Sequence, residues 1–210
     1  AKERRPQLGR PVVRPALDGT LIQRISLPGT AESRLLWVVS YLPGTFVASL
    51  VDRSPELLRS IGTFMGEIDE ALATFTHPAL RRALPWDLMQ ASRSLRYANL
   101  LPSNERGRVT FVLNDAMDRL YHQMAPLRRS VIHNDANDLI LLAQAVGGQY
   151  RMSGLIDFGD MVETHTVCEV AIALTYLLMD APDLIDVATP LLQEYHAVYP
   201  LSGDEVAVLY

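Results

Sequence analysis

The hydrophobic pattern divides this chain into a strand-like opening and a longer, mostly helical part. Short apolar runs between turn signals predict strands at 11–16, 21–26 and 34–41. After residue 54, apolar residues recur at helical spacing, and this spacing predicts helices over 54–74, 102–124, 166–179 and 183–199 and another from 202 onward. The pattern therefore indicates an α+β chain, with a small β-part over residues 1–44 and a helical lobe over 45–210.

Two of these helices carry clear start signals. Ser54 precedes a proline at the first helical position, and Ser202 with Glu205 forms a capping-box pattern. In the helix over 102–124, six apolar side chains are expected on the inner face. They are Val109, Val112, Leu113, Ala116, Leu120 and Met124.

One β-hairpin is predicted inside the helical lobe. The apolar runs 139–146 and 150–156 are separated by Gly147-Gly148, a pair that supplies the positive φ angles of a tight turn. A hairpin returns the chain to its starting end, so Asp135 before it and Asp157 after it should lie close together. Two neighbouring carboxylates repel each other unless a proton or cation lies between them, which predicts a divalent-metal and phosphate site.

Composition narrows the function classes. The net charge of −5 argues against a general nucleic-acid binder, and 49% hydrophobic residues suffice for a substantial core. The lone cysteine, Cys168, cannot form a disulfide framework and suits a reducing compartment. The longest apolar run, 170–179, is shorter than the roughly 20 residues that a membrane span needs. We therefore expect a cytoplasmic protein without nucleic-acid or membrane partners.

Two motifs around the predicted hairpin resemble a known family. His133-Asn-Asp135, followed one hairpin later by Ile156-Asp-Phe-Gly-Asp160, resembles the catalytic and metal loops of the aminoglycoside phosphotransferase and choline kinase superfamily. The stretches 133–138, 154–162 and 164–169 are similar to its hydroxylysine-kinase-like branch. The resemblance implies a protein-kinase-like fold of the aminoglycoside phosphotransferase type. It has a partial N-terminal nucleotide lobe and a mainly helical C-terminal lobe that carries the catalytic hairpin.

The resemblance also implies roles for three residues. Asp135 would be the catalytic base that accepts the hydroxyl proton of the acceptor, and His133 would brace the catalytic loop. Asp157 would hold Mg²⁺ against the nucleotide phosphates. The implied reaction transfers the γ-phosphate of ATP or GTP to the hydroxyl of a small amino alcohol or hydroxy amino acid, similar to ethanolamine or hydroxylysine. A fused or associated pyridoxal-phosphate enzyme is a further implied partner.

Other candidate residues have two interpretations each. Ser40, Tyr41 and Leu42 would contact the nucleotide base through their backbone, or they simply precede a Pro-Gly turn. Three polar residues of the two loops would support the site or contact a substrate ammonium group: Asn137, Asp138 and Asp160.

Three candidates outside the loops are open in the same way. Trp86 and Asp87 would suit a substrate ammonium, or Trp86 packs on the core and Asp87 caps a helix. His165 would reach the rim of the active site or cap the following helix.

Two departures from the family pattern bear on activity. Ile140 occupies the position at which the family has a metal-binding asparagine, and it has no ligand atom. The only lysine, Lys2, does not lie in a strand that could hold the α- and β-phosphates. We therefore expect a fragment that lacks most of the nucleotide lobe, or a nucleotide site that has decayed.

Two alternative functions follow from these features. The first is a catalytically impaired, kinase-like module that binds a partner as a scaffold. The second is a metal-dependent hydrolase built from His133, Asp135, Asp157, Asp160 and His165, although such enzymes usually gather more histidines.

Overall fold

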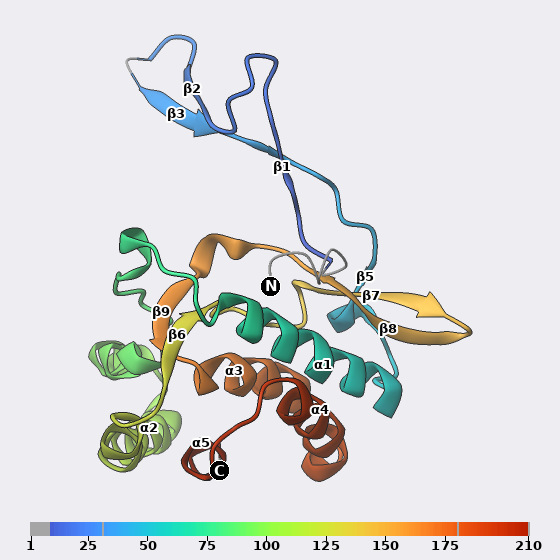
Figure 1. Cartoon of the computed structure of the whole chain (residues 1–210). Coiled ribbons are helices and arrows are strands. Elements are labelled where there is room, and N and C mark those ends of the chain that lie inside the picture. The colour runs from blue at the N-terminus through green and yellow to red at the C-terminus, as the bar shows by residue number, and fades with distance from the viewer. Residues whose placement is uncertain (1–8, 31, 180, 210) are drawn as a thin grey trace.

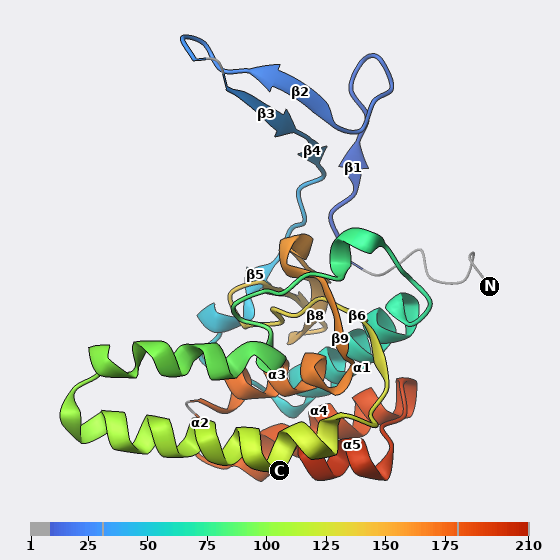
Figure 2. The same ribbon diagram turned by 90° about the vertical axis from the view of Figure 1, so that its left-hand side faces the viewer.

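A slender β-ribbon stands out from a helical body (Figure 1). The computed structural model describes residues 9–30, 32–179 and 181–209. Lys2, the only lysine of the chain, lies outside the described residues. The ribbon rises from one end of the body in both views (Figures 1 and 2).

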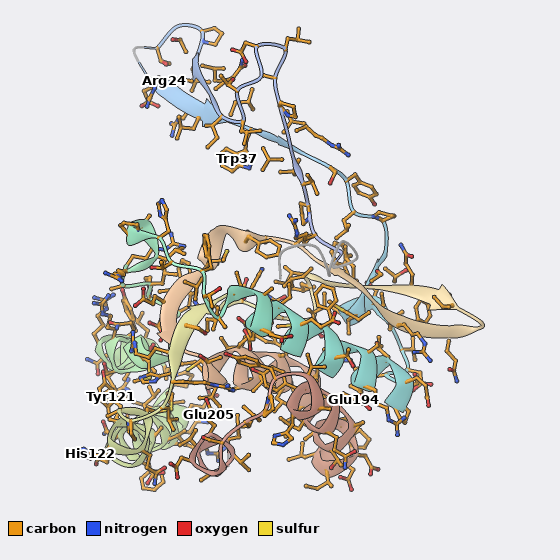
Figure 3. All side chains as sticks on the ribbon, in the orientation of Figure 1. Arg24, Trp37, Tyr121, His122, Glu194 and Glu205 are labelled. Carbon is orange, nitrogen blue, oxygen red and sulfur yellow. The ribbon has the colours of Figure 1, made fainter. Side chains whose placement is uncertain are left out.

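Four short strands form the ribbon. β1 (Val13–Arg14) pairs antiparallel with β4 (Val38–Val39), and β2 (Gln23–Ser26) pairs antiparallel with β3 (Ser33–Leu36). The predicted strand regions are confirmed, although the strands are shorter than the apolar runs. Apolar side chains remain exposed along the ribbon, as Figure 3 shows for Trp37.

The predicted hairpin is present in the body. β7 (Leu141–Val146) and β8 (Gln149–Leu155) pair antiparallel, and β5 (Thr45–Phe46) adds a third strand beside β7. Gly147 and Gly148 have φ angles of 61° and 84°, so the turn uses the left-handed conformation that the glycine pair predicted.

A second sheet lies next to this hairpin. β6 (Arg129–Ile132) pairs antiparallel with β9 (Val162–His165). The chain passes from β6 to β7 through residues 133–140, and from β8 to β9 through residues 156–161 and the short 3-10 helix η4 (Phe158–Asp160). Both candidate loops therefore connect the same two sheets.

Four helices form the base of the body. They are α1 (Pro55–Leu72), α3 (Val167–Leu178), α4 (Leu184–Val198) and α5 (Gly203–Val208). The predicted starts are confirmed, because the Ser54 side chain accepts a bond from Leu57 N and both bonds of the Ser202–Glu205 capping box are formed. α1 lies very close to α4, since a Cβ on Gly62 would come within 2.1 Å of the Leu191 carbonyl oxygen. None of the helices in the described residues is long and apolar enough to cross a membrane.

A helical hairpin projects from one side of the body (Figure 2). It consists of the 3-10 helix η3 (Leu88–Leu100) and α2 (Ser103–Met124); the short 3-10 helices η1 (Val47–Ser49) and η2 (Pro78–Leu80) lie elsewhere. The predicted inner face of α2 is wrong in its first half, because Val109 and Val112 are exposed where α2 extends beyond the body. Leu113 and Ala116 are half-buried and Met124 is buried, whereas the side chain of Leu120 lies outside the description.

Candidate active site

One buried histidine links the two loops. His133 has no exposed surface, and its Nε2 lies 3.0 Å from the carbonyl oxygen of Ile156. Its ring meets the ring of Phe158 edge-on, with the centroids 4.9 Å apart. Because a carbonyl oxygen only accepts, the imidazole donates Nε2–H to it. His133 therefore braces the start of one candidate loop against the start of the other. The first, residues 133–140, is called the catalytic loop, and the second, residues 156–161, the metal loop.

Three carboxylates lie within electrostatic reach of this histidine. Burial lowers the pKa of His133, while the charges of Asp135, Asp157 and Asp160 act in the opposite direction. All three therefore share one region around the imidazole. The hairpin thus brings the two loops together as the sequence predicted.

Both loops contain a residue in the left-handed conformation. Asn134 has a φ of 69° and Asp157 a φ of 63°, and they are the non-glycine residues of the described chain with positive φ. Asn and Asp tolerate this conformation better than other residues, but it still costs energy, so surrounding contacts must hold it.

Glu169 on α3 supplies such contacts for the catalytic loop. Its Oε2 accepts hydrogen bonds from the backbone N–H of His133 and from that of Asn134, the latter at 3.1 Å. Glu169 has no exposed surface, and burial raises its pKa to about 7 even though the two bonds act in the opposite direction. A buried carboxyl group therefore fixes the backbone directly before Asp135. The sequence offered one signal for this role, since Glu169 is the only charged residue of α3.

A second buried carboxyl lies near Glu169. Asp69 on α1 is fully buried, and the Tyr195 hydroxyl donates to its Oδ2 at 2.5 Å. Burial raises the pKa of Asp69 well above its usual value, and the charge of Glu169 adds to this shift. Asp69 Oδ1 and Glu169 Oε1 have no hydrogen-bond partner among the described residues. The core beneath the catalytic loop therefore favours protonated carboxyl groups.

Asp135 is held by its own loop. The side-chain amide of Asn137 donates to Asp135 Oδ1 at 2.8 Å, and the Asn137 Oδ1 accepts from Leu139 N at 2.9 Å. Asn137 therefore orients the candidate base, which was one of the two roles predicted for it. Asp138 instead forms an ion pair with Arg53 at 2.6 Å, and Arg53 also donates to the Leu177 carbonyl at 3.0 Å. The loop is thereby tied to the C-terminal end of α3.

The metal loop is more exposed. Asp157 is exposed, and its Oδ1 accepts a bond from Gly159 N at 3.4 Å. Arg82 lies against the loop and donates to the carbonyl oxygens of Gly159 and Met161, at 2.5 and 2.8 Å. Arg82 fixes two backbone carbonyls and leaves the Asp157 carboxylate accessible. Sequence reasoning missed Arg82, because nothing in the Arg81-Arg82 pair indicates which carbonyls it reaches.

A pocket of about 490 Å³ opens beside Asp135. Asp135 and Asp160 lie in its wall together with Trp86, which is 55% exposed. The other lining residues come from the catalytic loop, η3 and the α3 segment: Asn134, Leu88, Ile172, Thr175, Tyr176 and Met179. The structure therefore brings Trp86 and Asp160 to the candidate base.

Asp87 and His165 do not reach this pocket. Asp87 is buried, accepts bonds from Met89 N at 3.0 Å and Thr164 Oγ1 at 3.2 Å, and caps η3. It lines a separate pocket of about 750 Å³ together with His165, which is buried at the end of β9 beside Arg129. The interpretation that they contact the same substrate as Asp135 is therefore wrong, whereas the alternative that Asp87 caps a helix is confirmed. His165 also does not cap α3, which has Thr166 at its N-cap without a side-chain bond.

Residues 7–204 match the phosphotransferase enzyme family. The chain belongs to this family. It is 28% identical to hydroxylysine kinase of Danio rerio over 207 residues, which cover 93% of this chain and 57% of that protein. This similarity confirms the resemblance to the hydroxylysine-kinase-like branch. The chain spans about half the length of the curated relatives that it matches.

Solved phosphotransferase structures share the fold of the chain. The microcompartment-associated aminopropanol kinase superposes with a TM-score of 0.70 at 20% identity, covering 96% of this chain and 63% of that one. Amicoumacin kinase, solved with AMP-PNP, Ca²⁺ and Ami, gives a TM-score of 0.64 at 18% identity, covering 96% and 62%. The kinase-like α+β fold of the aminoglycoside phosphotransferase type is therefore confirmed.

The side chains of the two loops suit one kind of magnesium binding. Ile140 is buried in the hydrophobic core, so its position supplies no ligand, and the described residues contain no cluster of three or more side chains suited to a metal ion. Mg²⁺ is usually held by one or two carboxylates together with substrate phosphates. Asp157 therefore fits an ion that arrives with a nucleotide.

The segment that would meet the nucleotide base lies between the ribbon and the body. Ser40 is paired with β1, because its N–H donates to the Val12 carbonyl at 2.9 Å and its Oγ accepts from Val12 N at 2.9 Å. Tyr41 is exposed, and Leu42 packs against Gly154 of β8. The backbone N–H of Ser40 is therefore engaged, which leaves Tyr41 and Leu42 as the better candidates.

Proposed function

We propose that this chain carries the acceptor and catalytic part of a small-molecule kinase. The enzyme would transfer the γ-phosphoryl group of ATP or GTP to the hydroxyl of a small alcohol that also bears an amine. The observation that carries the proposal is the pocket in which Asp135, oriented by Asn137, lies beside Asp160 and Trp86. The aromatic face and the second carboxylate suit an ammonium group next to the reacting hydroxyl.

The reaction needs one proton acceptor and precise positioning. The acceptor oxygen attacks the γ-phosphorus, the bond between this phosphorus and the β–γ bridging oxygen breaks, and Asp135 takes the hydroxyl proton. The nucleoside diphosphate leaves with the electron pair of the broken bond. Magnesium, bound with the nucleotide phosphates through Asp157, would neutralise their charge. His133 and Glu169 keep the loop in place and are positioning residues.

The proposal also covers the acceptor compounds and the division of the chain into two lobes. Hydroxylysine-like and ethanolamine-like compounds are the acceptors that we propose to test first, because relatives of the chain are named as hydroxylysine and aminopropanol kinases. We take residues 1–44 as part of a nucleotide lobe and 45–210 as the catalytic lobe, a division supported by the separation of ribbon and body (Figure 2). The pyridoxal-phosphate partner and the cytoplasmic location stay predictions.

The test is phosphoryl transfer to these acceptors by the chain and two matched variants. Asp135→Asn should lower the transfer rate by about 10²–10⁴-fold, the usual contribution of a general base. Asp118→Asn changes an exposed carboxylate on α2 and should leave the rate unchanged. Transfer at a near-normal rate in Asp135→Asn would refute the assigned base.

One observation favours a second function, that of a kinase-like binding module. Ile140 is buried at the position of the expected metal ligand, which removes one oxygen donor from the site. Such a module would bind the amine but would transfer no phosphate at any magnesium concentration. The hydrolase alternative loses support, because His165 lies in a different pocket from Asp135 and Asp160.

A further inference from the structure

The lining of the pocket beside Asp135 contains two carboxylates. Asp135 and Asp160 both line it, and both charges act on the neighbouring His133. Arg53 forms an ion pair with Asp138, and Arg82 donates to the carbonyl oxygens of Gly159 and Met161; neither arginine is in the described lining of the pocket. The two aspartates therefore make part of the pocket lining acidic, and an acidic lining attracts a cation.

The rest of the pocket lining is mostly apolar. This apolar wall consists of Leu88, Ile172 and Met179 together with the aromatic residues Trp86 and Tyr176. Met179 is 71% exposed, so hydrocarbon remains open to solvent at this wall. The Thr175 hydroxyl donates to the Ala171 carbonyl at 2.8 Å. Burying an apolar group against this wall would be favourable.

No cationic side chain lines the pocket among the described residues. Its lining contains two aspartates but no lysine, arginine or histidine. A carboxylate on the ligand would therefore find no partner, would be repelled by Asp135 and Asp160, and would lose hydration against the apolar wall. A hydrocarbon arm of the same length meets none of these costs.

From this arrangement we infer that the acceptor is an amino alcohol without a carboxylate, whose apolar arm lies on Ile172 and Met179. The inference rests on the proposed function and specifies its substrate class. The ammonium and hydroxyl groups occupy the end near Asp160 and Asp135, and the arm points toward the α3 segment. Amino acids such as hydroxylysine are then poor ligands for this chain, although relatives carry the name hydroxylysine kinase.

Two compounds of equal length test the inference directly. 1-Amino-2-butanol and 4-amino-3-hydroxybutanoate share the amine and the hydroxyl and differ in a terminal methyl against a carboxylate. Calorimetric titration of the chain should show binding of the butanol at least about tenfold tighter. Across 2-aminoethanol, 1-amino-2-propanol and 1-amino-2-butanol, affinity should rise about fourfold for each added carbon.

A charge introduced into the apolar wall should reverse the preference. Thr175→Arg places a cation on the exposed side of α3, within the pocket lining. Relative to 1-amino-2-butanol, binding of 4-amino-3-hydroxybutanoate should improve at least about tenfold. Thr175→Gln changes the same position without adding charge and should keep the original order.

Binding and transfer distinguish the two proposals. Suppose that 1-amino-2-butanol binds more tightly than 4-amino-3-hydroxybutanoate but no phosphoryl transfer is observed. This result refutes the proposed kinase activity and supports the inference about the ligand. Equal or tighter binding of the hydroxybutanoate, or no binding of any amine, refutes the inference even if transfer to another acceptor is observed.

Discussion

The catalytic loop and the N-terminal ribbon are supported in opposite ways. Residues 133–138 are fixed by two side chains from distant parts of the chain, Glu169 of α3 and Arg53 before α1. The ribbon is held mainly by its own strand pairs, and Trp37, Val38 and Val39 remain exposed on it. Figure 3 shows Trp37 on the ribbon, away from the packed helices.

This difference shows where the molecule is preorganised. A loop with a left-handed residue at Asn134 needs external support, and the core beneath it provides that support. The ribbon has no comparable cover among the described residues. Changes beneath the loop should therefore act strongly on stability and transfer, whereas changes on the ribbon should act weakly.

The largest effect is expected from Glu169→Ala. This change leaves the buried N–H groups of His133 and Asn134 without an acceptor, so the free energy of unfolding should fall by about 3 kcal/mol. Misplacement of Asp135 should lower transfer about a hundredfold. Urea denaturation and a transfer assay check both values. Glu169→Gln keeps an acceptor oxygen and serves as the matched control, which should lose much less; a loss below 1 kcal/mol in the alanine variant would contradict the support assigned to Glu169.

A comparable effect should appear in the pH dependence of stability. Burial raises the folded-state pKa of Glu169 to about 7 from an ordinary value of 4.5, so the folded state binds the proton more tightly than the unfolded state. The tighter proton binding adds to the free energy of unfolding. This added stability is fully present below pH 4.5 and is lost as the pH rises through about 7. It corresponds to roughly 3 kcal/mol, from about 1.36 kcal/mol per pKa unit. Asp69 shifts in the same direction.

Glu169→Gln removes that titration and tests it. Denaturation curves between pH 4.5 and 8 should show the parent losing stability relative to the variant by about 3 kcal/mol as the pH rises. Parallel curves for the two proteins over this range would mean that Glu169 does not titrate as its burial implies.

An intermediate effect is expected from Arg53→Ala. This change breaks the partly buried pair with Asp138 and removes a donor from the carbonyl of Leu177, which should lower stability by about 1–2 kcal/mol. A double-mutant cycle with Asp138→Asn isolates the pair. A coupling energy near zero would show that the pair does not tie the loop to α3.

The smallest effect is expected on the ribbon. Trp37→Ser replaces a half-exposed side chain outside the packed body, so the free energy of unfolding should change by less than about 0.5 kcal/mol. A loss above about 1 kcal/mol in urea denaturation would show that the ribbon is packed against the body in solution, and the contrast with the catalytic loop would disappear.

Local patterns predicted much of this fold. The glycine pair at 147–148 and the apolar runs beside it predicted the hairpin, and Ser54 and Ser202 marked helix starts that the structure confirms. The hairpin turn and the helix starts depend only on residues that are adjacent in the sequence, so local sequence patterns are enough to predict them. The convergence of Asp135 and Asp157 followed from hairpin geometry for the same reason.

The remaining features depend on tertiary packing. Periodicity placed Val109 and Val112 on an inner face, but it does not show that the first half of α2 projects beyond the body. His165 lies five residues after Asp160, yet β9 carries it to another pocket, and Asp87 turns inward beside the exposed Trp86. The roles of Glu169 and Arg82 require knowledge of which distant backbone groups they reach.

The central claim is that the two loops form one phosphoryl-transfer site with separate roles for Asp135 and Asp157. Calorimetric titration with ATP and GTP, with and without Mg²⁺, tests it most directly in the parent chain and in Asp135→Asn and Asp157→Ala. We predict magnesium-dependent binding that survives Asp135→Asn and is lost in Asp157→Ala. Binding that is independent of magnesium, or that is unaffected by Asp157→Ala, would contradict the account.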